Sequence, residues 1–329
     1  MADNPSMKKS SSKKLNKYRR QKSQAPNILL QPRDIAILVA VNDYLGFLTR
    51  EQIQKLFFGS QSPFESTKKK SDGLKTACNR LKLLFHNGYL NRYAPRRDRQ
   101  GIMDYHSLTI RLFAPRPFLY YLTEQGARIV AEAKGISFKD VNYKRKFRER
   151  DESKLFHEMN ITDTRITLAS AEQKYIDRIK ILEWRSENDC AQPYTVKHPQ
   201  TGKWQRKFFR PDAYFKLRIG EETIASFLEV DTGTESHSRR IIDKVKRYQE
   251  YSKEGLFKKE YNEEKFRVLI VTTRSEDRIV NMKHEIEKIV KGVFWFTTRD
   301  QILYNPEFLF EPLWLKAGNI DHLSFYMSG

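Results

Sequence analysis

The sequence predicts a two-domain α+β protein, in which a small domain of short helices and a β-hairpin precedes a larger α/β domain with a central mixed sheet. Three observations support this prediction. The chain of 329 residues has room for about two ordinary domains. Apolar residues recur at helical spacing between residues 32 and 88, whereas short β-branched and aromatic runs alternate with helical patterns after residue 179. A basic run without apolar period, residues 144–150, separates the two regions.

The composition indicates an anionic partner. The formal net charge is +20, from 61 Lys and Arg against 41 Asp and Glu, and we expect nucleic acid to be that partner. The sequence has no apolar run of about 18 residues or more and no apolar core of a secretory signal, so we expect a cytoplasmic protein without membrane contact. Cys78 and Cys190 lie far apart, which excludes a disulfide framework and a zinc finger.

The N-terminal region begins with a tail and three helices. Residues 1–30 are expected to form a disordered basic tail, either a solubilising end or an arm that adds phosphate contacts, because residues 1–22 hold six Lys and two Arg against one Asp. Helical spacing after Pro32 predicts the first helix, and the T-x-x-Q capping box at Thr49 predicts the start of the second. A third helix is expected from Ser71 or Asp72 to Gly88.

The third helix has a buried stripe and a polar face that suits a DNA major groove. The expected stripe is Leu74, Ala77, Cys78, Leu81, Leu84 and Phe85. The polar strip consists of Lys75, Asn79, Lys82 and His86, with Thr76 and Arg80 beside it. We predict DNA contacts by Lys75, Thr76, Asn79, Arg80 and Lys82. The alternative is a solvated charged face.

A hairpin with an Arg-rich loop follows the third helix. Residues 89–93 and 118–122 alternate like paired strands, and Thr123 can cap a fourth helix. The order α-α-α-β-β-α over residues 31–135 is typical of a winged helix-turn-helix, a module that binds duplex DNA and in other proteins docks protein partners. The hairpin adds four predicted DNA contacts, Arg92, Arg96, Arg97 and Arg99. We expect residues 136–151 to be a basic linker.

The C-terminal domain, residues 152–329, shows an α-β-β-β-α-β order with a further αβ pair appended. The expected elements are a helix over about 155–169, strands at 179–184, 208–215 and 223–230, a helix from Ser236 or Ser238, a strand at 267–273, another helix and a strand at 293–296.

Three acids of this domain form a candidate metal site. If Gly220-Glu221 is a two-residue turn, residues whose numbers sum to 441 face each other, so Asp212 lies opposite Glu229. Asp231 follows Glu229 by two positions and points to the same face. Mg²⁺, which binds one or two carboxylates with water and phosphate oxygens, fits such a site. The alternative is strand-end acids paired with basic neighbours, namely Arg210, Lys216, Lys244 or Arg247.

At these residues the sequence resembles the replication-relaxation family of plasmid and mobile-element proteins. The resemblance rests on residues 211–215 (PDAYF), 227–234 (FLEVDTGT), Tyr248 and 268–273 (VLIVTT), and extends over about residues 32–300, including 81–90, 120–127 (YYLTEQGA) and His157. It implies a role in plasmid replication or DNA relaxation, with double-stranded DNA and plasmid replication proteins as partners. A homodimer is compatible with it, since paired winged helices commonly read inverted half-sites.

The second domain also resembles the restriction-endonuclease-like fold and its PD-(D/E)xK motif. The resemblance puts Pro211-Asp212 and Glu229 in the metal-binding positions, whereas Asp231 stands where that motif has its catalytic Lys. Lys244 or Lys246 could supply the missing ammonium, and His157 or Glu158 an extra ligand or acid. The resemblance therefore implies a Mg²⁺-dependent DNA-nicking nuclease. The alternatives are a non-catalytic DNA-binding regulator whose nuclease-like domain is an interaction platform, and an RNA-binding protein.

Overall fold

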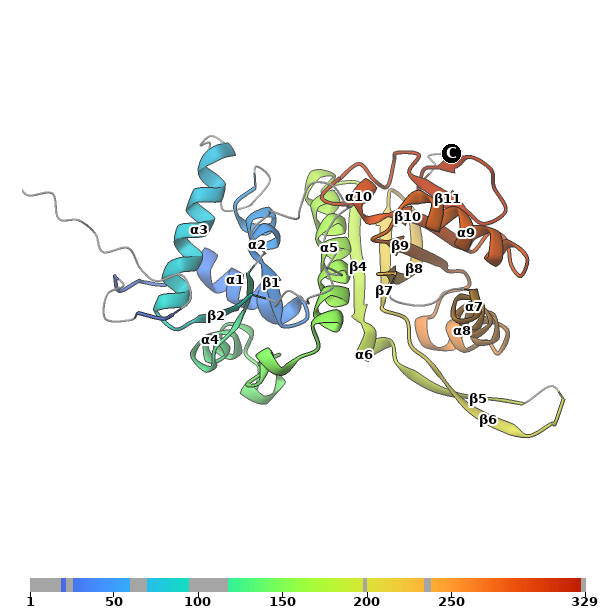
Figure 1. Ribbon diagram of the computed structural model, residues 1–329, viewed down its shortest axis with the longest axis horizontal. Coiled ribbons are helices and arrows are strands. Elements are labelled where there is room, and N and C mark those ends of the chain that lie inside the picture. The colour runs from blue at the N-terminus through green and yellow to red at the C-terminus, as the bar shows by residue number, and fades with distance from the viewer. Residues whose placement is uncertain are drawn as a thin grey trace, which may run out of the picture. The chain divides into compact units, whose positions relative to one another are not determined.

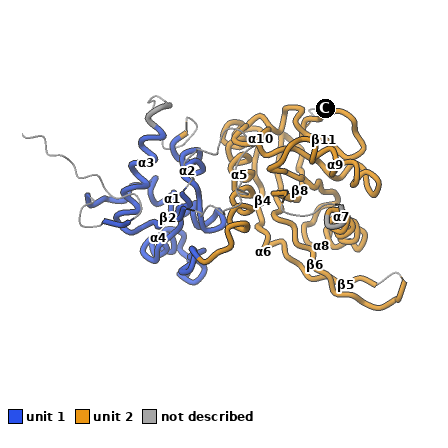
Figure 2. The backbone as a smooth tube through the Cα atoms, in the orientation of Figure 1, with its two compact units in different colours: residues 1–58, 66–94, 118–148 blue, residues 59–65, 95–117, 149–329 orange. Residues whose placement is uncertain are grey.

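The computed structural model describes residues 19–21, 26–59, 70–94, 118–197, 200–233 and 238–326. The chain forms two compact units (Figure 2): unit 1 comprises Met1–Phe58, Ser66–Ala94 and Phe118–Arg148, and unit 2 comprises Gly59–Glu65, Pro95–Pro117 and Glu149–Gly329. Most of the expected N-terminal tail lies outside the described residues. None of the helices in the described ranges is long and apolar enough to cross a membrane.

Unit 1 combines helices with a small antiparallel sheet (Figure 1). Its elements are α1 (Pro32–Asp43), β1 (Phe47–Thr49), α2 (Arg50–Phe57), α3 (Lys70–His86), β2 (Leu90–Tyr93), β3 (Leu119–Leu122) and α4 (Glu124–Lys134). In the described part of the unit, three strands pair in the order β1-β3-β2. The expected order α-α-α-β-β-α omits one element of unit 1, the strand β1, which lies between α1 and α2. Its three residues are all buried, so they show no alternation that a sequence pattern could detect.

Local hydrogen bonds explain where two of these helices begin. Thr49 Oγ1 accepts from the backbone N–H of Gln52 at 3.1 Å, and Gln52 Oε1 accepts from the backbone N–H of Thr49 at 2.8 Å, which is the predicted capping box of α2. Thr123 Oγ1 accepts from the N–H of Gly126 at 3.0 Å and caps α4. The core of unit 1 includes Ile37, Leu38, Phe47, Ile53, Leu81, Leu84, Leu122 and Val130, all at most 1% exposed.

The segment expected as a linker is partly packed onto unit 1. It contains the short 3-10 helices η2 (Phe138–Asp140) and η3 (Phe147–Glu149). The Phe147 ring stacks on Tyr121 of β3 with centroids 4.2 Å apart, and Phe147 is only 1% exposed. Residues 136–148 therefore belong to unit 1, because Phe147, the buried Val141 and a hydrogen bond from the Asn142 backbone N–H to Asn42 attach them to it.

Unit 2 is built on a large mixed sheet. Its elements are α5 (Glu152–Lys174), β4 (Ile179–Ser186), α6 (Glu187–Cys190), β5 (Gln192–Lys197), β6 (Trp204–Phe209), β7 (Ala213–Ile219), β8 (Glu222–Asp231), α7 (Ser238–Lys253), α8 (Leu256–Tyr261), β9 (Arg267–Thr272), α9 (Glu276–Glu287), β10 (Phe294–Thr298), α10 (Arg299–Ile302), β11 (Trp314–Lys316) and β12 (His322–Leu323). Within the described residues, seven strands lie in the order β12-β11-β10-β9-β8-β7-β4. The strands β8, β9 and β10 are parallel, and the other neighbours are antiparallel.

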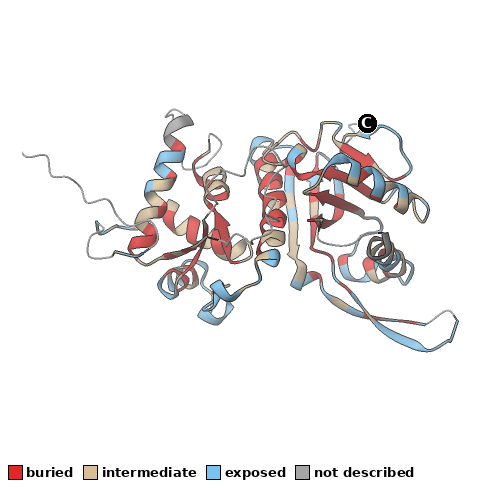
Figure 3. Cartoon of the chain, in the orientation of Figure 1, coloured by how far each residue is buried: buried red, intermediate tan, exposed pale blue. Residues whose placement is uncertain are grey.

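Helices cover this sheet and bury its strands (Figure 3). One apolar cluster joins the sheet to α7, α8 and α9, and includes Tyr214, Phe227, Tyr248, Phe257, Val268, Ile279, Met282 and Phe294. Helix α5 packs against β4 and β8.

The hairpin β7–β8 has the predicted register. Ala213 pairs with Leu228 and Ile219 with Glu222, so the turn is the two-residue Gly220-Glu221, in which Gly220 has a φ of +58°. The expected strand 208–215, however, is two strands. Pro211 cannot donate a backbone hydrogen bond, and residues 210–212 separate β6 from β7. Strand β6 instead pairs with β5, a strand that sequence analysis missed.

Candidate functional site

Asp212 lies in the link between β6 and β7, where fixed donors hold its carboxylate. Its Oδ2 accepts from the backbone N–H of Val230 at 2.7 Å, and its Oδ1 lies 3.1 Å from Nε2 of His157 on α5. Asp212 is 9% exposed. Burial raises the pKa of Asp212, but the hydrogen bond from His157 and the nearby charge of Lys244 outweigh it, so the pKa lies below its usual range. Asp212 is therefore ionised at neutral pH.

Glu229 on β8 lies beside Asp212, with its side chain directed to α7. The hydroxyl of Tyr248 donates to Oε1 at 2.6 Å, and the ammonium of Lys244 donates to Oε2. Glu229 is almost fully buried. Burial raises the pKa of Glu229 to about 7; the charge of Asp212 acts in the same direction and Lys244 opposes it. Near neutral pH this carboxyl group can therefore gain or lose a proton.

Lys244 and His157 complete the cluster. The Lys244 side chain is 41% exposed, so the Glu229 pair is open to water on the lysine side. Burial lowers the pKa of His157, but its hydrogen bond to Asp212 and that carboxylate's charge outweigh it, so the pKa is raised. The structure thus brings two sequence-named candidates, Lys244 and His157, to the two carboxylates. For Tyr248 the sequence offers no signal beyond the family resemblance.

Asp231, the third predicted metal ligand, is already neutralised. Arg278 in the first turn of α9 donates from Nη2 to Oδ1 at 2.6 Å, and the Thr272 hydroxyl donates to Oδ2 at 2.7 Å. Burial raises the pKa of Asp231, but these hydrogen bonds outweigh it and the pKa is lowered. Over the residues that the structure describes, no group of three or more His, Cys, Asp or Glu is placed to hold a metal ion. Asp231 is therefore held by Arg278 and Thr272, and its part in a metal site stays a prediction.

Sequence analysis missed Arg278, because its contact with Asp231 follows from the pairing of β8 with β9 and not from a local sequence pattern. The residue pair Asp231 and Thr272 is aligned in the parallel strands β8 and β9. The helix that follows β9 therefore begins at the same edge of the sheet as Asp231, and a basic residue in its first turn is in reach of that acid.

Two carboxylates remain for a cation. Asp212 and Glu229 offer hard oxygen ligands beside a partly exposed lysine. This donor set fits Mg²⁺, which takes one or two carboxylates and fills its other positions with water or phosphate oxygens. The alternative acid Glu158 is engaged elsewhere, because Arg150 donates to its Oε1 at 2.6 Å. Lys246 is exposed on α7, and Lys244 is the lysine that reaches Glu229.

The predicted DNA-binding face of α3 is retained only in part. Lys75, Thr76 and Asn79 are exposed, and Lys82 is half-buried. Arg80 instead donates from Nε to Oδ1 of Asp34 on α1 at 2.6 Å, and the side chain of Asp34 is fully buried. This contact corrects the assignment of Arg80, because an acid far away in the sequence draws it to the helix α1.

Three further assignments on α3 and β2 are corrected. His86 is fully buried, and its Nδ1 accepts from the backbone N–H of Gln21 at 3.1 Å. Leu74, expected in the core, is 40% exposed. Arg92 is 9% exposed, with its guanidinium 3.9 Å from the Phe85 ring centroid, so it packs against the core. The loop residues Arg96, Arg97 and Arg99 lie outside the described residues.

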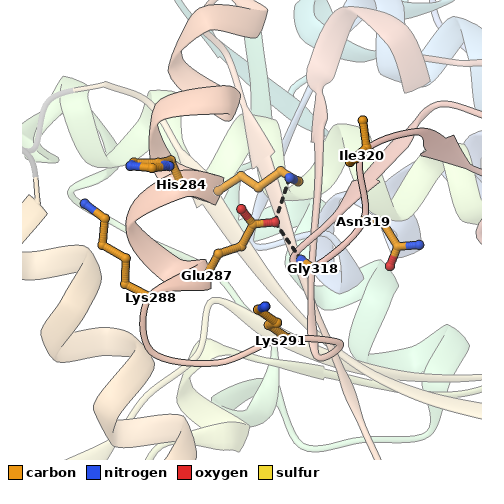
Figure 4. A pocket seen from close by; sticks show the side chains of 8 residues that line it. His284, Glu287, Lys288, Lys291, Gly318, Asn319 and Ile320 are labelled. Atoms are coloured by element: carbon orange, nitrogen blue, oxygen red, sulfur yellow. Dashed lines mark hydrogen bonds and ion pairs between the residues drawn. The ribbon is translucent and has the colours of Figure 1, made fainter.

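A separate hollow of about 350 Å³ lies at the C-terminal end of α9 and contains none of the predicted site residues (Figure 4). Lys283, Lys288 and Lys291 line it, and Glu287 accepts hydrogen bonds from Lys283 and from the backbone N–H of Gly318. The hollow is basic and lies at the opposite end of α9 from Arg278.

Three comparisons with known proteins place these findings in context. A family model described as replication-relaxation matches residues 42–265. No curated protein matches the chain. Among solved structures, the restriction endonuclease FokI bound to DNA is similar, with 14% identity and a TM-score of 0.23 over 86% of this chain and 46% of that one. This chain thus spans about half the length of the endonuclease, and at this score the similarity does not establish a common fold.

Proposed function

Since this chain belongs to the replication-relaxation family, we propose that it binds DNA and acts in the replication or relaxation of plasmid or other mobile-element DNA, as a Mg²⁺-dependent nicking nuclease. The observation that carries the proposal is the convergence of Asp212, Glu229 and Lys244 from a strand link, a strand and a helix. Two acids beside a partly exposed cation can hold a metal ion and a phosphate together.

Unit 1 is assigned the role of a winged helix-turn-helix. The assignment is supported by the order α1-β1-α2-α3-β2-β3-α4 and by the strand order β1-β3-β2. In this assignment α3 is the recognition helix, and Lys75, Thr76 and Asn79 are the side chains that reach the DNA.

Unit 2 is assigned a restriction-endonuclease-like core. Supporting it, the elements α5-β4-β7-β8-α7-β9 follow the α-β-β-β-α-β order, with β4, β7 and β8 antiparallel and β9 parallel to β8. Asp212 and Glu229 would hold Mg²⁺. The PD-(D/E)xK motif has its catalytic lysine at the position of Asp231, and in this chain Lys244 would fill that role. Lys244 would then leave Glu229 Oε2 and stabilise negative charge on the phosphate.

The proposed reaction is phosphodiester hydrolysis. One water molecule adds across a P–O ester bond, which leaves a phosphate monoester on one end and a hydroxyl group on the other. A bound Mg²⁺ ion supplies a polarised phosphate oxygen and a water molecule of lowered pKa. The chain's own part is to fix two carboxylates through His157, Val230 and Tyr248 and to place the Lys244 ammonium beside them.

Incubation of supercoiled plasmid DNA with the full-length protein tests this proposal. We expect relaxed circles in the presence of Mg²⁺ and none in EDTA, and loss of nicking in Asp212→Ala and Glu229→Ala with duplex binding retained. Glu221→Gln, an exposed acid in the turn of the same hairpin, serves as the matched control and should nick normally. Supercoiled DNA that stays intact with every divalent cation would contradict the nuclease assignment and leave DNA binding unaffected.

A second candidate function is a non-catalytic DNA-binding regulator that uses unit 2 as an interaction platform. The Asp231–Arg278 pair favours it, because an internally neutralised acid occupies the position of the catalytic lysine. Lys244 and Glu229 likewise neutralise each other without a metal ion. Titration calorimetry distinguishes the two candidates: saturable Mg²⁺ binding that Asp212→Ala removes supports the nuclease, and no heat of binding supports the regulator.

A further inference from the structure

The hairpin of β5 and β6 extends away from the sheet of unit 2 (Figure 1), and its two faces differ in burial. Its inner face packs on α7: Phe209 stacks on Tyr251 with centroids 3.9 Å apart, and the Lys207 ammonium donates to Oε1 of Glu250 at 2.7 Å. Tyr194 is buried on the same face. The contacts of the inner face therefore explain how the hairpin is held on α7.

The outer face carries two exposed aromatic rings with cations beside them. Trp204 is 71% exposed and Phe208 is 54% exposed. Arg206 lies between them on the strand, with its guanidinium carbon 5.3 Å from the Phe208 ring centroid, and Lys197 is the cross-strand partner of Trp204. Two large rings left in water on one face of a ribbon indicate a surface that a partner covers.

The charge of this segment identifies the chemistry of the partner. Residues 191–210 contain no Asp or Glu, and beside Lys207 and Arg210, which pair with Glu250 and Glu187, they carry Lys197, Lys203 and Arg206. The partner is therefore anionic, and it must also offer flat apolar surfaces to the two rings. A DNA duplex presents phosphates but stacks its base faces inside the helix. An unpaired strand presents phosphates and open base faces together, which is the combination that exposed aromatic and basic side chains bind.

We propose that the outer face of the β5–β6 hairpin binds single-stranded DNA, with bases stacked on Trp204 and Phe208 and phosphates beside Arg206 and Lys197. Trp204 and Phe208 lie four residues apart on one strand, about 13 Å, so each ring takes a separate base. This inference rests on the proposed function for the choice of DNA, and it adds the form of DNA that unit 2 handles.

The position of the hairpin in the chain connects this surface to the candidate site. Strand β6 ends at Phe209, and residues 210 and 211 lead directly to Asp212. A DNA strand bound on the outer face of the hairpin would therefore lie next to the link that supplies the Asp212 carboxylate. Plasmid DNA that is locally unpaired, as in a negatively supercoiled molecule, would be the substrate of such an arrangement.

Fluorescence anisotropy with the full-length protein in EDTA tests this inference, because it requires neither metal nor nicking. The probes are a labelled oligo(dT) of about 20 nucleotides and a blunt duplex of about 20 base pairs. Trp204→Ala combined with Phe208→Ala should weaken oligo(dT) binding at least tenfold, since each stacked base contributes about 1–3 kcal/mol, and should change duplex binding less than twofold. Trp204→Phe keeps a ring and should retain most of the affinity.

Matched controls separate a stacking surface from a general loss of affinity. Phe138→Ala removes an aromatic side chain of unit 1 that is 36% exposed and should leave oligo(dT) binding unchanged. Equal losses on both probes, or no loss on oligo(dT), overturn the inference. If the double variant changes the mass measured by light scattering while oligo(dT) affinity stays the same, the face is a contact between copies of the chain and the inference is wrong. Failure of the nicking assay alone leaves these readings unaffected.

Discussion

Glu229 and Asp231 lie two residues apart on the same face of β8, and their surroundings are opposite. Glu229 meets Lys244, whose side chain is 41% exposed, and burial raises the pKa of Glu229 to about 7. Asp231 meets Arg278, whose side chain is 17% exposed, and its pKa is lowered despite burial. Strand alternation decides which face an acid occupies, whereas the helix above it decides whether its charge is available to a ligand.

The same contrast separates polar side chains on α3 of unit 1. Arg80 is held by the buried carboxylate of Asp34, whereas Lys75 and Asn79 are exposed. Removing one partner of a largely buried ion pair destabilises the fold, whereas a partly exposed charged group can exchange its partner for a ligand.

The largest effect is expected for Arg80→Ala. The substitution leaves Asp34, which is fully buried, without its guanidinium partner, and such losses cost about 3–5 kcal/mol. Chemical denaturation of the purified variant measures the change in the free energy of unfolding. Lys75→Ala, on the exposed face of the same helix, should change it by about 0.5 kcal/mol or less. If Arg80→Ala is as stable as the native chain and loses DNA affinity instead, the sequence-based assignment of Arg80 is right.

A smaller loss of about 2–3 kcal/mol is expected for Asp231→Ala, because the Asp231 and Arg278 side chains keep 15% and 17% exposure. Arg278 would then lose the carboxylate that it contacts at the edge of the sheet. Combining Asp231→Ala with Arg278→Met should recover much of the loss, since removal of both charges avoids an unpaired one. The measurement is again denaturation, with both single variants alongside. A double variant less stable than Asp231→Ala would show that the pair is not the reason for the loss.

The fold was easier to predict from the sequence than the site, for a physical reason. The β7–β8 register followed from one glycine-containing turn, and the capping box of α2 followed from Thr49 and Gln52, because both depend on residues close in sequence. The roles of Asp231 and Arg80 depend on Arg278 and Asp34, which lie 47 and 46 residues away in the chain. Local patterns carry no information on such partners.

The hairpin β5–β6 shows the same limit for secondary structure. Residues 192–197 and 204–209 alternate between the inner and outer faces, yet the outer face carries Trp204 and Phe208, so no polar–apolar alternation marks β6. The sequence pattern therefore predicts a single strand, 208–215, which joins the end of β6 to the start of β7 across Pro211. Hydrophobic patterning identifies strands whose outer face is solvated, and it fails where that face carries apolar side chains.

The raised pKa of Glu229 predicts a pH dependence in the metal-free protein. The folded chain keeps a proton on Glu229 up to about pH 7, whereas the unfolded chain releases it near its ordinary value of 4.5. This group therefore lowers the free energy of unfolding as pH rises from 4.5 to 7, by at most about 1.4 kcal/mol per pH unit. Denaturation at pH 5, 6, 7 and 8 in EDTA measures it.

One variant assigns that slope to Glu229. Glu229→Gln should flatten the dependence between pH 5 and 7. His157, whose raised pKa gives stability that is lost as pH rises through it, should account for the slope that remains above about pH 6.5. Asp212 and Asp231 have lowered pKa values and lose their contribution only in acid, as pH falls below the usual aspartate range. A slope that persists unchanged in Glu229→Gln would show that Glu229 is ionised throughout.

The smallest effect is expected for Lys75→Ala on duplex binding. If Lys75 contacts one phosphate, its loss should weaken binding several-fold and reduce the slope of log affinity against log salt by about one. Anisotropy titrations at several salt concentrations measure both quantities. Lys139→Ala, an exposed lysine on η2, is the matched control, and it should change neither. Equal changes in the two variants would mean that unit 1 attracts DNA through its overall charge, and the exposed face of α3 would then have no special part in binding.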